Sequence, residues 1–217
     1  TNTGEVTAEQ EIALQLGATD SVVDTTNVKI GAANTSTVQL AYNTTTNDVG
    51  GLNFTIVSED DESTVSVNVL EQAEFDVVLN STSSTQSVRV GETIIINATI
   101  TNRGEVDDRQ DIKFNYRGAS RSRSVALSGN ESTTVEFTYE ARTRDIGENR
   151  SAIVASDDDT ETIRFDVFKP AVFDVEVNKT ASVTEVSNEE AIQLVATVEN
   201  RGTRSGTQNV TLAVAGN

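Results

Sequence analysis

An asparagine followed two residues later by a glycine occurs three times at nearly equal intervals along the chain. The three tetrapeptides are Thr1-Asn2-Thr3-Gly4, Thr101-Asn102-Arg103-Gly104 and Glu199-Asn200-Arg201-Gly202. Their asparagines are 100 and 98 residues apart. A period of that length corresponds to a whole small domain, because single supersecondary repeats are shorter. We therefore expect tandem domains.

The middle tetrapeptide ends a stretch in which apolar residues alternate. One face of this stretch carries Ile94, Ile96, Ala98 and Ile100, and the other carries Ile95, Asn97, Thr99 and Thr101. Such a period of two predicts a half-buried strand. Similar short alternating runs occur between residues 74 and 168, and they show no helical periodicity. They predict seven strands separated by turns. The predicted fold class is all-β, with tandem immunoglobulin-like antiparallel β-sandwiches.

The flanking segments match parts of this middle repeat. Residues 1–72 resemble its later strands, and residues 170–217 resemble its opening strands, so the predicted domains are 1–72, 73–169 and 170–217. Each flanking part would leave a hydrophobic face open. One interpretation is a window on a longer tandem array. The other is that the last part of one copy completes the first part of the next, although both parts contain a Gln-x-[Ile/Val] strand.

The junctions between repeats are short. About five residues separate the inward-facing strand positions on either side, and the second junction contains the only proline, Pro170. Proline fixes its own φ angle. Because these linkers are short and apolar, we expect a stiff connection.

Composition narrows the class of function. Cys, His, Met and Trp are absent, so a thiol nucleophile, a zinc–thiolate site and a histidine base are all excluded. We therefore predict that the chain is not an enzyme. No stretch approaches the roughly 18 apolar residues of a membrane-spanning helix.

The net charge is −18, with 34 acidic residues against 12 Arg and 4 Lys. Such a chain repels nucleic acid. A surface with many carboxylates and few lysines is similar to surfaces of proteins from salt-loving archaea, and an ordinary acidic, solubilising surface is the alternative.

The repeat resembles the CARDB family, the cell-adhesion-related immunoglobulin-like domains of bacterial and archaeal surface proteins. The residues that carry the resemblance are Phe75-Asp76-Val77, Val90-Gly91-Glu92, the Thr-Asn-Arg-Gly turn, Gly129-Asn130-Glu131-Ser132, Gly147 and Asp157-Asp158-Asp159. These motifs are turns and alternations, so they indicate fold more than function. The resemblance implies an exported, multi-domain surface protein. The acidic, lysine-poor composition of these repeats looks like that of haloarchaeal members.

Nine Asn-x-Ser/Thr sequences are candidate N-glycosylation sites. They are Asn34, Asn43, Asn53, Asn80, Asn97, Asn130, Asn149, Asn178 and Asn209. Chance would give roughly four in a chain of this composition. Glycans are bulky and hydrated and would shield strand edges. The alternative is that Asn, Ser and Thr are simply frequent in turns and on polar strand faces.

Two acidic turns occupy the same position in successive repeats. They contain Asp60 and Asp61, between Glu59 and Glu62, and Asp157, Asp158 and Asp159. Calcium requires several converging oxygen ligands, which these turns could supply in part. The spaced EF-hand pattern is absent, so a solvated acidic hairpin is the favoured interpretation and calcium the weaker one. No other cofactor is predicted.

Arginine is unevenly distributed. Five arginines fall in two loops of the middle repeat: Arg117, Arg121, Arg123, Arg142 and Arg144. Residues 1–73 instead carry 11 carboxylates and one Lys. This asymmetry could steer contacts between neighbouring arrays, and local ion pairs are the alternative.

These observations predict a section of an extracellular, cell-surface filament, stalk or adhesin. Its partners would be copies of itself or neighbouring repeats in a fibre, with covalent N-glycans. Two alternatives are surface-binding accessory repeats of a secreted enzyme and a viral fibre.

Overall fold

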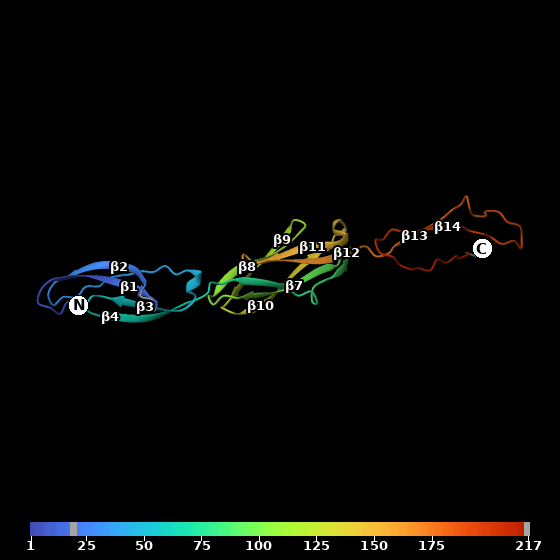
Figure 1. The fold of residues 1–217 in the computed structure, drawn as a ribbon. Coiled ribbons are helices and arrows are strands. Elements are labelled where there is room, and N and C mark those ends of the chain that lie inside the picture. The colour runs from blue at the N-terminus through green and yellow to red at the C-terminus, as the bar shows by residue number, and fades with distance from the viewer. Residues whose placement is uncertain (18–20, 215–217) are drawn as a thin grey trace. The chain divides into compact units, whose positions relative to one another are not determined.

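The computed structural model describes residues 1–17 and 21–214. In chain order its strands are β1 (Ala8–Leu16), β2 (Ser21–Ile30), β3 (Gly50–Val57), β4 (Glu62–Val69), β5 (Phe75–Leu79), β6 (Ser87–Arg89), β7 (Thr93–Asn102), β8 (Asp108–Tyr116), β9 (Ala119–Leu127), β10 (Ser132–Glu140), β11 (Gly147–Ala155), β12 (Thr160–Phe168), β13 (Phe173–Val177) and β14 (Ala196–Asn200). Two single-turn 3-10 helices, η2 (Thr46–Asp48) and η3 (Thr143–Asp145), precede β3 and β11. Figure 1 traces these strands along the chain, from β1 in blue to β14 in red.

The middle repeat is a two-sheet β-sandwich. One sheet has the order β10-β7-β5 and the other β6-β12-β11-β8-β9. The pairs β10–β7, β11–β12 and β11–β8 are antiparallel, whereas β6 pairs in parallel with β12. The predicted all-β class, built from antiparallel sheets packed as a sandwich, is confirmed.

The core of this sandwich comes from the alternating residues of facing strands. Ile94, Ile96, Ala98 and Ile100 of β7 are all fully buried. They pair with Tyr139, Phe137, Val135 and Thr133 of β10. Across the sandwich the Phe114 and Phe137 rings stack with centroids 5.6 Å apart. Period-two sequences therefore place their apolar faces where the sheets meet.

The first repeat contains one four-stranded sheet of order β2-β1-β3-β4. Its buried apolar residues are Leu14 and Phe54. Residues 35–42 carry the alternation of β10 but are not in a strand. A strand requires a partner for its hydrogen bonds, and no counterpart of β7 lies beside this segment in the described chain.

The third repeat contains the antiparallel pair β13 and β14, in which Val175 pairs with Val198. The Gln-x-Val sequence of this repeat, Gln208-Asn209-Val210, was expected to lie in a strand, but residues 208–214 are not in one. The apolar side chains of β13 and β14 remain largely exposed, because the described part of this repeat contains no second sheet to cover them.

The chain separates into two compact units. The first is Thr1–Glu74 with Asn102–Asp108 and Ser128–Asn130, and the second contains the remainder. The change of unit after Glu74 lies close to the predicted boundary at 72/73. The compact units do not separate the third predicted domain from the second.

Candidate functional site

Asn102 is the centre of the predicted Asn-x-Gly turn and is fully buried. Its amide nitrogen donates to the carbonyl oxygens of Val106 at 2.8 Å and Ser128 at 3.2 Å. Its amide oxygen accepts from the backbone N–H groups of Gly104 at 3.1 Å and Glu74 at 3.3 Å. One side chain thus satisfies four backbone groups from three separate segments.

The same arrangement recurs at the other two copies of the turn. Asn2 donates to Val6 O at 2.7 Å and to Ile30 O at 3.0 Å. Asn200 donates to Arg204 O at 2.9 Å, and its oxygen accepts from Val172 N at 3.2 Å. In both copies the asparagine oxygen also accepts from the N–H of the glycine two residues on. The sequence repeat is therefore a repeat of hydrogen bonding.

The linkers before the second and third repeats pair with these turns. Arg103 N donates to Glu74 O at 2.8 Å, and Glu105 N donates to Glu71 O at 3.0 Å. In the next repeat Arg201 N donates to Val172 O at 2.8 Å, and Thr203 N to Lys169 O at 2.9 Å. We call this arrangement the junction clasp: residues 71–74 held on the turn 102–106, and residues 169–172 held on 200–203.

The glycines of the second and third turns allow the linkers to approach. A Cβ atom built on Gly104 would lie 1.9 Å from Gln72 O, and one on Gly202 would lie 2.0 Å from Pro170 O. Both obstacles are backbone atoms and cannot be relieved by a side-chain rotation. The glycine in Asn-x-Gly is therefore required by packing against the linker.

A second repeated unit joins a tyrosine to an aspartate six residues later. In the middle repeat Tyr139 Oη donates to Asp145 Oδ2 at 3.1 Å, and Arg142 N donates to the same oxygen at 2.8 Å. In the first repeat Tyr42 Oη donates to Asp48 Oδ2 at 3.1 Å. Each pair fixes a 3-10 turn, which in the middle repeat joins β10 of one sheet to β11 of the other and in the first repeat precedes β3. Sequence analysis missed this unit, although the repeated Tyr-x5-Asp spacing was available to find it.

Hydrogen bonds and burial near these corners shift the pKa values of two groups. Hydrogen bonds from the backbone and side chain of Thr45 lower the pKa of Asp48. Burial raises the pKa of Tyr116, and the nearby charge of Asp145 adds to this. The Tyr116 hydroxyl has no hydrogen-bond partner in the described structure. The Asp48 carboxylate stabilises its corner by accepting these hydrogen bonds, whereas the buried Tyr116 hydroxyl without a partner destabilises the folded state.

The acidic turn of the middle repeat attaches an edge strand to the sandwich. Asp158 Oδ2 accepts from Phe75 N at 2.8 Å and from Gln110 Nε2 at 2.7 Å. Asp159 Oδ2 accepts from Val77 N at 2.9 Å. Asp157 is exposed and pairs with Lys113 at 3.0 Å. Two of the three predicted calcium candidates of this turn therefore bind the backbone of β5.

The equivalent turn of the first repeat has only part of this arrangement. Gln10 Nε2 donates to Asp60 Oδ2 at 2.5 Å, as Gln110 does to Asp158. Asp61 is bonded through its own turn, with its carbonyl oxygen accepting from Ser58 N at 2.9 Å. Across residues 1–17 and 21–214, no group of three or more acidic residues is placed to hold a metal ion.

Most of the candidate glycosylation sites are on the surface. Eight are exposed, namely Asn34, Asn43, Asn53, Asn80, Asn130, Asn149, Asn178 and Asn209, whereas Asn97 is half-buried. The Asn97 amide nitrogen, which a glycan would occupy, donates to Ser83 O at 2.8 Å. Asn80 and Asn178 occupy equivalent positions, since their N–H groups donate to Asn97 O and Val195 O. Asn97 is thus the least accessible acceptor.

The clustered arginines have two different environments. Arg117 Nε lies 3.4 Å from Asp145 Oδ1, and Arg144 Nε lies 4.0 Å from it. These two arginines form local ion pairs with a buried carboxylate. Arg121 and Arg123 are exposed on β9.

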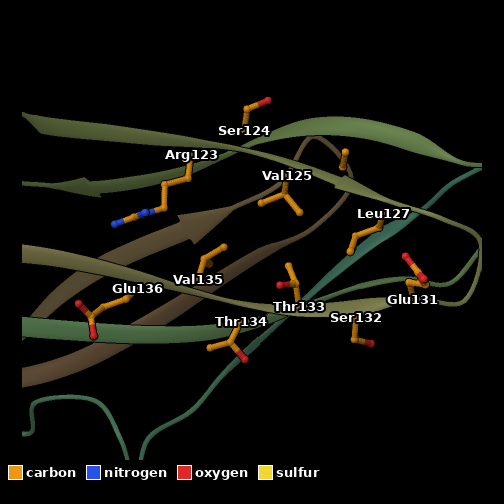
Figure 2. A pocket seen from close by; sticks show the side chains of 11 residues that line it. Arg123, Ser124, Val125, Leu127, Glu131, Ser132, Thr133, Thr134, Val135 and Glu136 are labelled. Carbon is orange, nitrogen blue, oxygen red and sulfur yellow. The ribbon is translucent and has the colours of Figure 1, made fainter.

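A groove of about 750 Å³ runs between β9 and β10, where the edges of the two sheets face each other. Figure 2 shows Val125 and Leu127 pointing from β9 toward β10, with Val135 directed toward them. Arg123 and Glu136 lie at one end of the groove and Glu131 at the other. The apolar floor belongs to the sandwich core, and the polar rim offers a contact surface between two sheet edges.

Fold and sites together define a class: an all-β chain of repeats, with a β-sandwich in the middle repeat, in which the prominent polar groups serve junctions and corners. No family model and no curated protein sequence matches the chain. Solved structures of a β-glucosidase from Listeria innocua, bound to glucose, gluconolactone or isofagomine, are similar at TM-scores of 0.33 to 0.34 and 16 to 17% identity. The match covers 44% of this chain and 16% of theirs. No helix of the described residues is long and apolar enough to cross a membrane.

Proposed function

We propose that the chain is a non-enzymatic structural section of an extracellular, N-glycosylated tandem-repeat filament, stalk or adhesin. The observation that carries this proposal is the junction clasp, which recurs at both linkers with the same donors, acceptors and glycine. A chain whose most consistent polar network lies at its junctions has a connecting role. Each repeat then supplies length, and each clasp removes freedom from the linker before it.

The surface supports the same proposal. Exposed Asn80 and Asn178 stand at equivalent places in successive repeats, so glycans on them would recur with the repeat. Glycans at such positions shield polar strand edges from pairing with other chains. The net charge of −18 keeps the surface hydrated at high salt, as expected for an exported protein of a salt-adapted archaeon with CARDB-like repeats.

Electron microscopy of the native source tests the proposal. We expect a periodic fibre with an axial rise of one or two repeats, and isolated globules would contradict it. Peptide mass spectrometry of the same material tests the glycan component. Hexose is expected on Asn80 and Asn178 with the lowest occupancy at Asn97, and unmodified peptides throughout would contradict it.

A further inference from the structure

The chain enters and leaves the middle sandwich at opposite ends. Phe75 begins β5, and its N–H group donates at 2.8 Å to Asp158 Oδ2, in the turn that precedes β12. Phe168 ends β12, and its carbonyl oxygen accepts from Val90 N at 3.0 Å. The nine residues of β12 separate these two ends by about 30 Å, at roughly 3.3 Å per residue. A pull applied through the two linkers of this repeat therefore acts along its strands.

The strand β6 is bonded in parallel to the strand by which the chain leaves. Residues 87–89 of β6 pair with residues 166–168 of β12. The ladder extends beyond β6 at both ends, because Asp166 N donates to Gln86 O at 2.9 Å and Val90 N donates to Phe168 O at 3.0 Å. A pull on the linkers draws β6 toward its own start and β12 toward its own end. The two strands are then sheared, and their bonds, which cross the direction of the pull, share it and break together.

The strand β5 is bonded to both sheets. It is the neighbour of β7 in one sheet, and Asn80 N, just beyond its end, donates to Asn97 O of β7 at 2.9 Å. Phe75 N and Val77 N donate instead to the carboxylates of Asp158 and Asp159, at 2.8 and 2.9 Å. These carboxylates belong to the turn between β11 and β12 of the other sheet. The edge of β5 that has no neighbouring strand in its own sheet is thus held by side chains.

The residues between β5 and β6 are also bonded as they cross from one sheet to the other. Thr85 N donates to Ile95 O at 2.8 Å, and the Thr85 hydroxyl accepts from Ile95 N at 2.9 Å. The Ser84 hydroxyl accepts from Asn97 N at 2.9 Å. Residues 75–90 are therefore tied to the sandwich along their length.

We propose that residues 75–90 form a tension clamp, in which the β6–β12 ladder and the carboxylate bonds to β5 resist a pull that passes along the chain. This inference rests on the proposed function, because a section of a filament or stalk is pulled along its length. Strands β7 to β11 lie in the chain between the clamp and β12. They can extend only after the clamp has broken, so resistance to tension and resistance to denaturant depend on different residues.

One bond of the clamp can be removed with little change to the fold. Glu92 N donates to Arg89 O at 3.1 Å, and Gly91 between them has a φ of +89°. A positive φ at the third residue alone is the geometry of a type II turn, whose second residue, here Val90, readily accepts proline. Val90→Pro therefore keeps the turn and removes the N–H that donates to Phe168 O.

Single-molecule force spectroscopy on the full chain, held by its first and last residues, measures the clamp. Unfolding of the middle repeat should lengthen the chain by about 300 Å, since about 94 residues extend to roughly 3.6 Å each from a folded length of about 30 Å. This length identifies the rupture peak of the middle repeat. A parallel ladder over residues 86–90 contains about four bonds, so Val90→Pro should lower the rupture force by roughly a quarter.

The matched control is a core substitution outside the clamp. Val125 is buried on β9, and Val125→Ala removes part of the core without touching residues 75–90 or β12. It should lower the urea midpoint more than Val90→Pro does, because it leaves a cavity, while its rupture force stays within about a tenth of the wild-type value.

A second pair of variants makes the test independent of the proline. Asp159→Ala removes the carboxylate that accepts from Val77 N, whereas Asp157→Ala removes an exposed carboxylate that pairs with Lys113. The rupture force should fall in Asp159→Ala and stay unchanged in Asp157→Ala. Rupture forces that follow the urea midpoints across all four variants would overturn the proposal, and so would a wild-type chain that lengthens without a rupture peak.

This measurement and the microscopy of the native source fail separately. A native fibre built from chains that lack the rupture peak would retain the proposed function and reject the clamp. A rupture peak that responds to Val90→Pro and Asp159→Ala as expected, in a protein whose native source shows isolated globules, would retain the clamp and reject the proposed function.

Discussion

Replacing Gly104 with alanine tests whether the junction clasp holds the linker. The new Cβ would lie 1.9 Å from Gln72 O, 2.5 Å from Gln72 C and 2.8 Å from Ala73 Cα. Ordinary carbon contacts begin near 3.5 Å, so the linker must retreat by about 1.5 Å. The φ angle of Gly104 is not in the left-handed region, so contact alone opposes the substitution.

That retreat breaks the backbone bonds of the clasp. Three bonds are at risk: Arg103 N to Glu74 O at 2.8 Å, and Glu105 N and Val106 N to Glu71 O at 3.0 and 3.2 Å. Lengthened by that amount, each passes the roughly 3.5 Å limit of a hydrogen bond. At about 1 kcal/mol each, the clasp loses about 3 kcal/mol of local stability, which corresponds to opening roughly 150 times more often.

Hydrogen exchange followed by mass spectrometry measures this opening. Peptides that contain residues 103–106 should exchange about 100-fold faster in Gly104→Ala than in the wild-type chain. Gly51→Ala is the control, because a Cβ there meets no atom within 4 Å. Gly202→Ala should reproduce the effect at the second junction only. Protection in Gly104→Ala within about threefold of wild type would refute the proposed role of the glycine.

Three further predictions concern the corner and the acidic turn. Tyr116→Phe removes a buried hydroxyl without a partner and should raise the free energy of unfolding by about 1 kcal/mol, whereas Tyr139→Phe should lower it by about 1 to 2 kcal/mol, both measured by urea denaturation. Burial raises the pKa of Tyr116 in the folded state. The free energy of unfolding of the wild-type chain therefore does not depend on the titration of Tyr116 below about pH 10, the unfolded value, and it decreases as pH rises through the higher folded pKa. Alkaline denaturation should therefore be shallower in Tyr116→Phe, and identical profiles would contradict this assignment. Asp158→Ala should destabilise the middle repeat by about 1 to 3 kcal/mol and Asp157→Ala by less than about 0.5 kcal/mol, and equal effects in thermal unfolding would show that the turn does not hold β5.

The sandwich of the middle repeat could be predicted because period-two alternation has few structural solutions. Ile94, Ile96, Ala98 and Ile100 must share a face in any strand, and burying that face requires a second sheet. The same pattern does not specify a partner. Residues 35–42 alternate like β10 but form no strand, because strand formation depends on a neighbour that the local pattern cannot supply.

The polar sites were less predictable because their contacts are distant in sequence. Asp158 and Asp159 looked like cation ligands or a solvated turn, and they bind the backbone of β5 about 80 residues earlier. Backbone N–H groups leave no signal in the sequence. Asn102 was recognisable as a repeated turn, but its bonds to Ser128 and Glu74 required the fold. Tyr139 and Asp145 left a signal only in the comparison with Tyr42 and Asp48.

The composition of the junction clasp has a consequence for how such a gene can change. Most of its contacts are between backbone groups, and side chains contribute through the asparagine and through the residue three positions later, Glu105 or Thr203. A DNA segment of one period can therefore be duplicated or deleted by recombination, and each new junction will already carry the groups it needs. Recombination can thus change the number of repeats in the protein, and each event changes the length of the chain by one whole repeat.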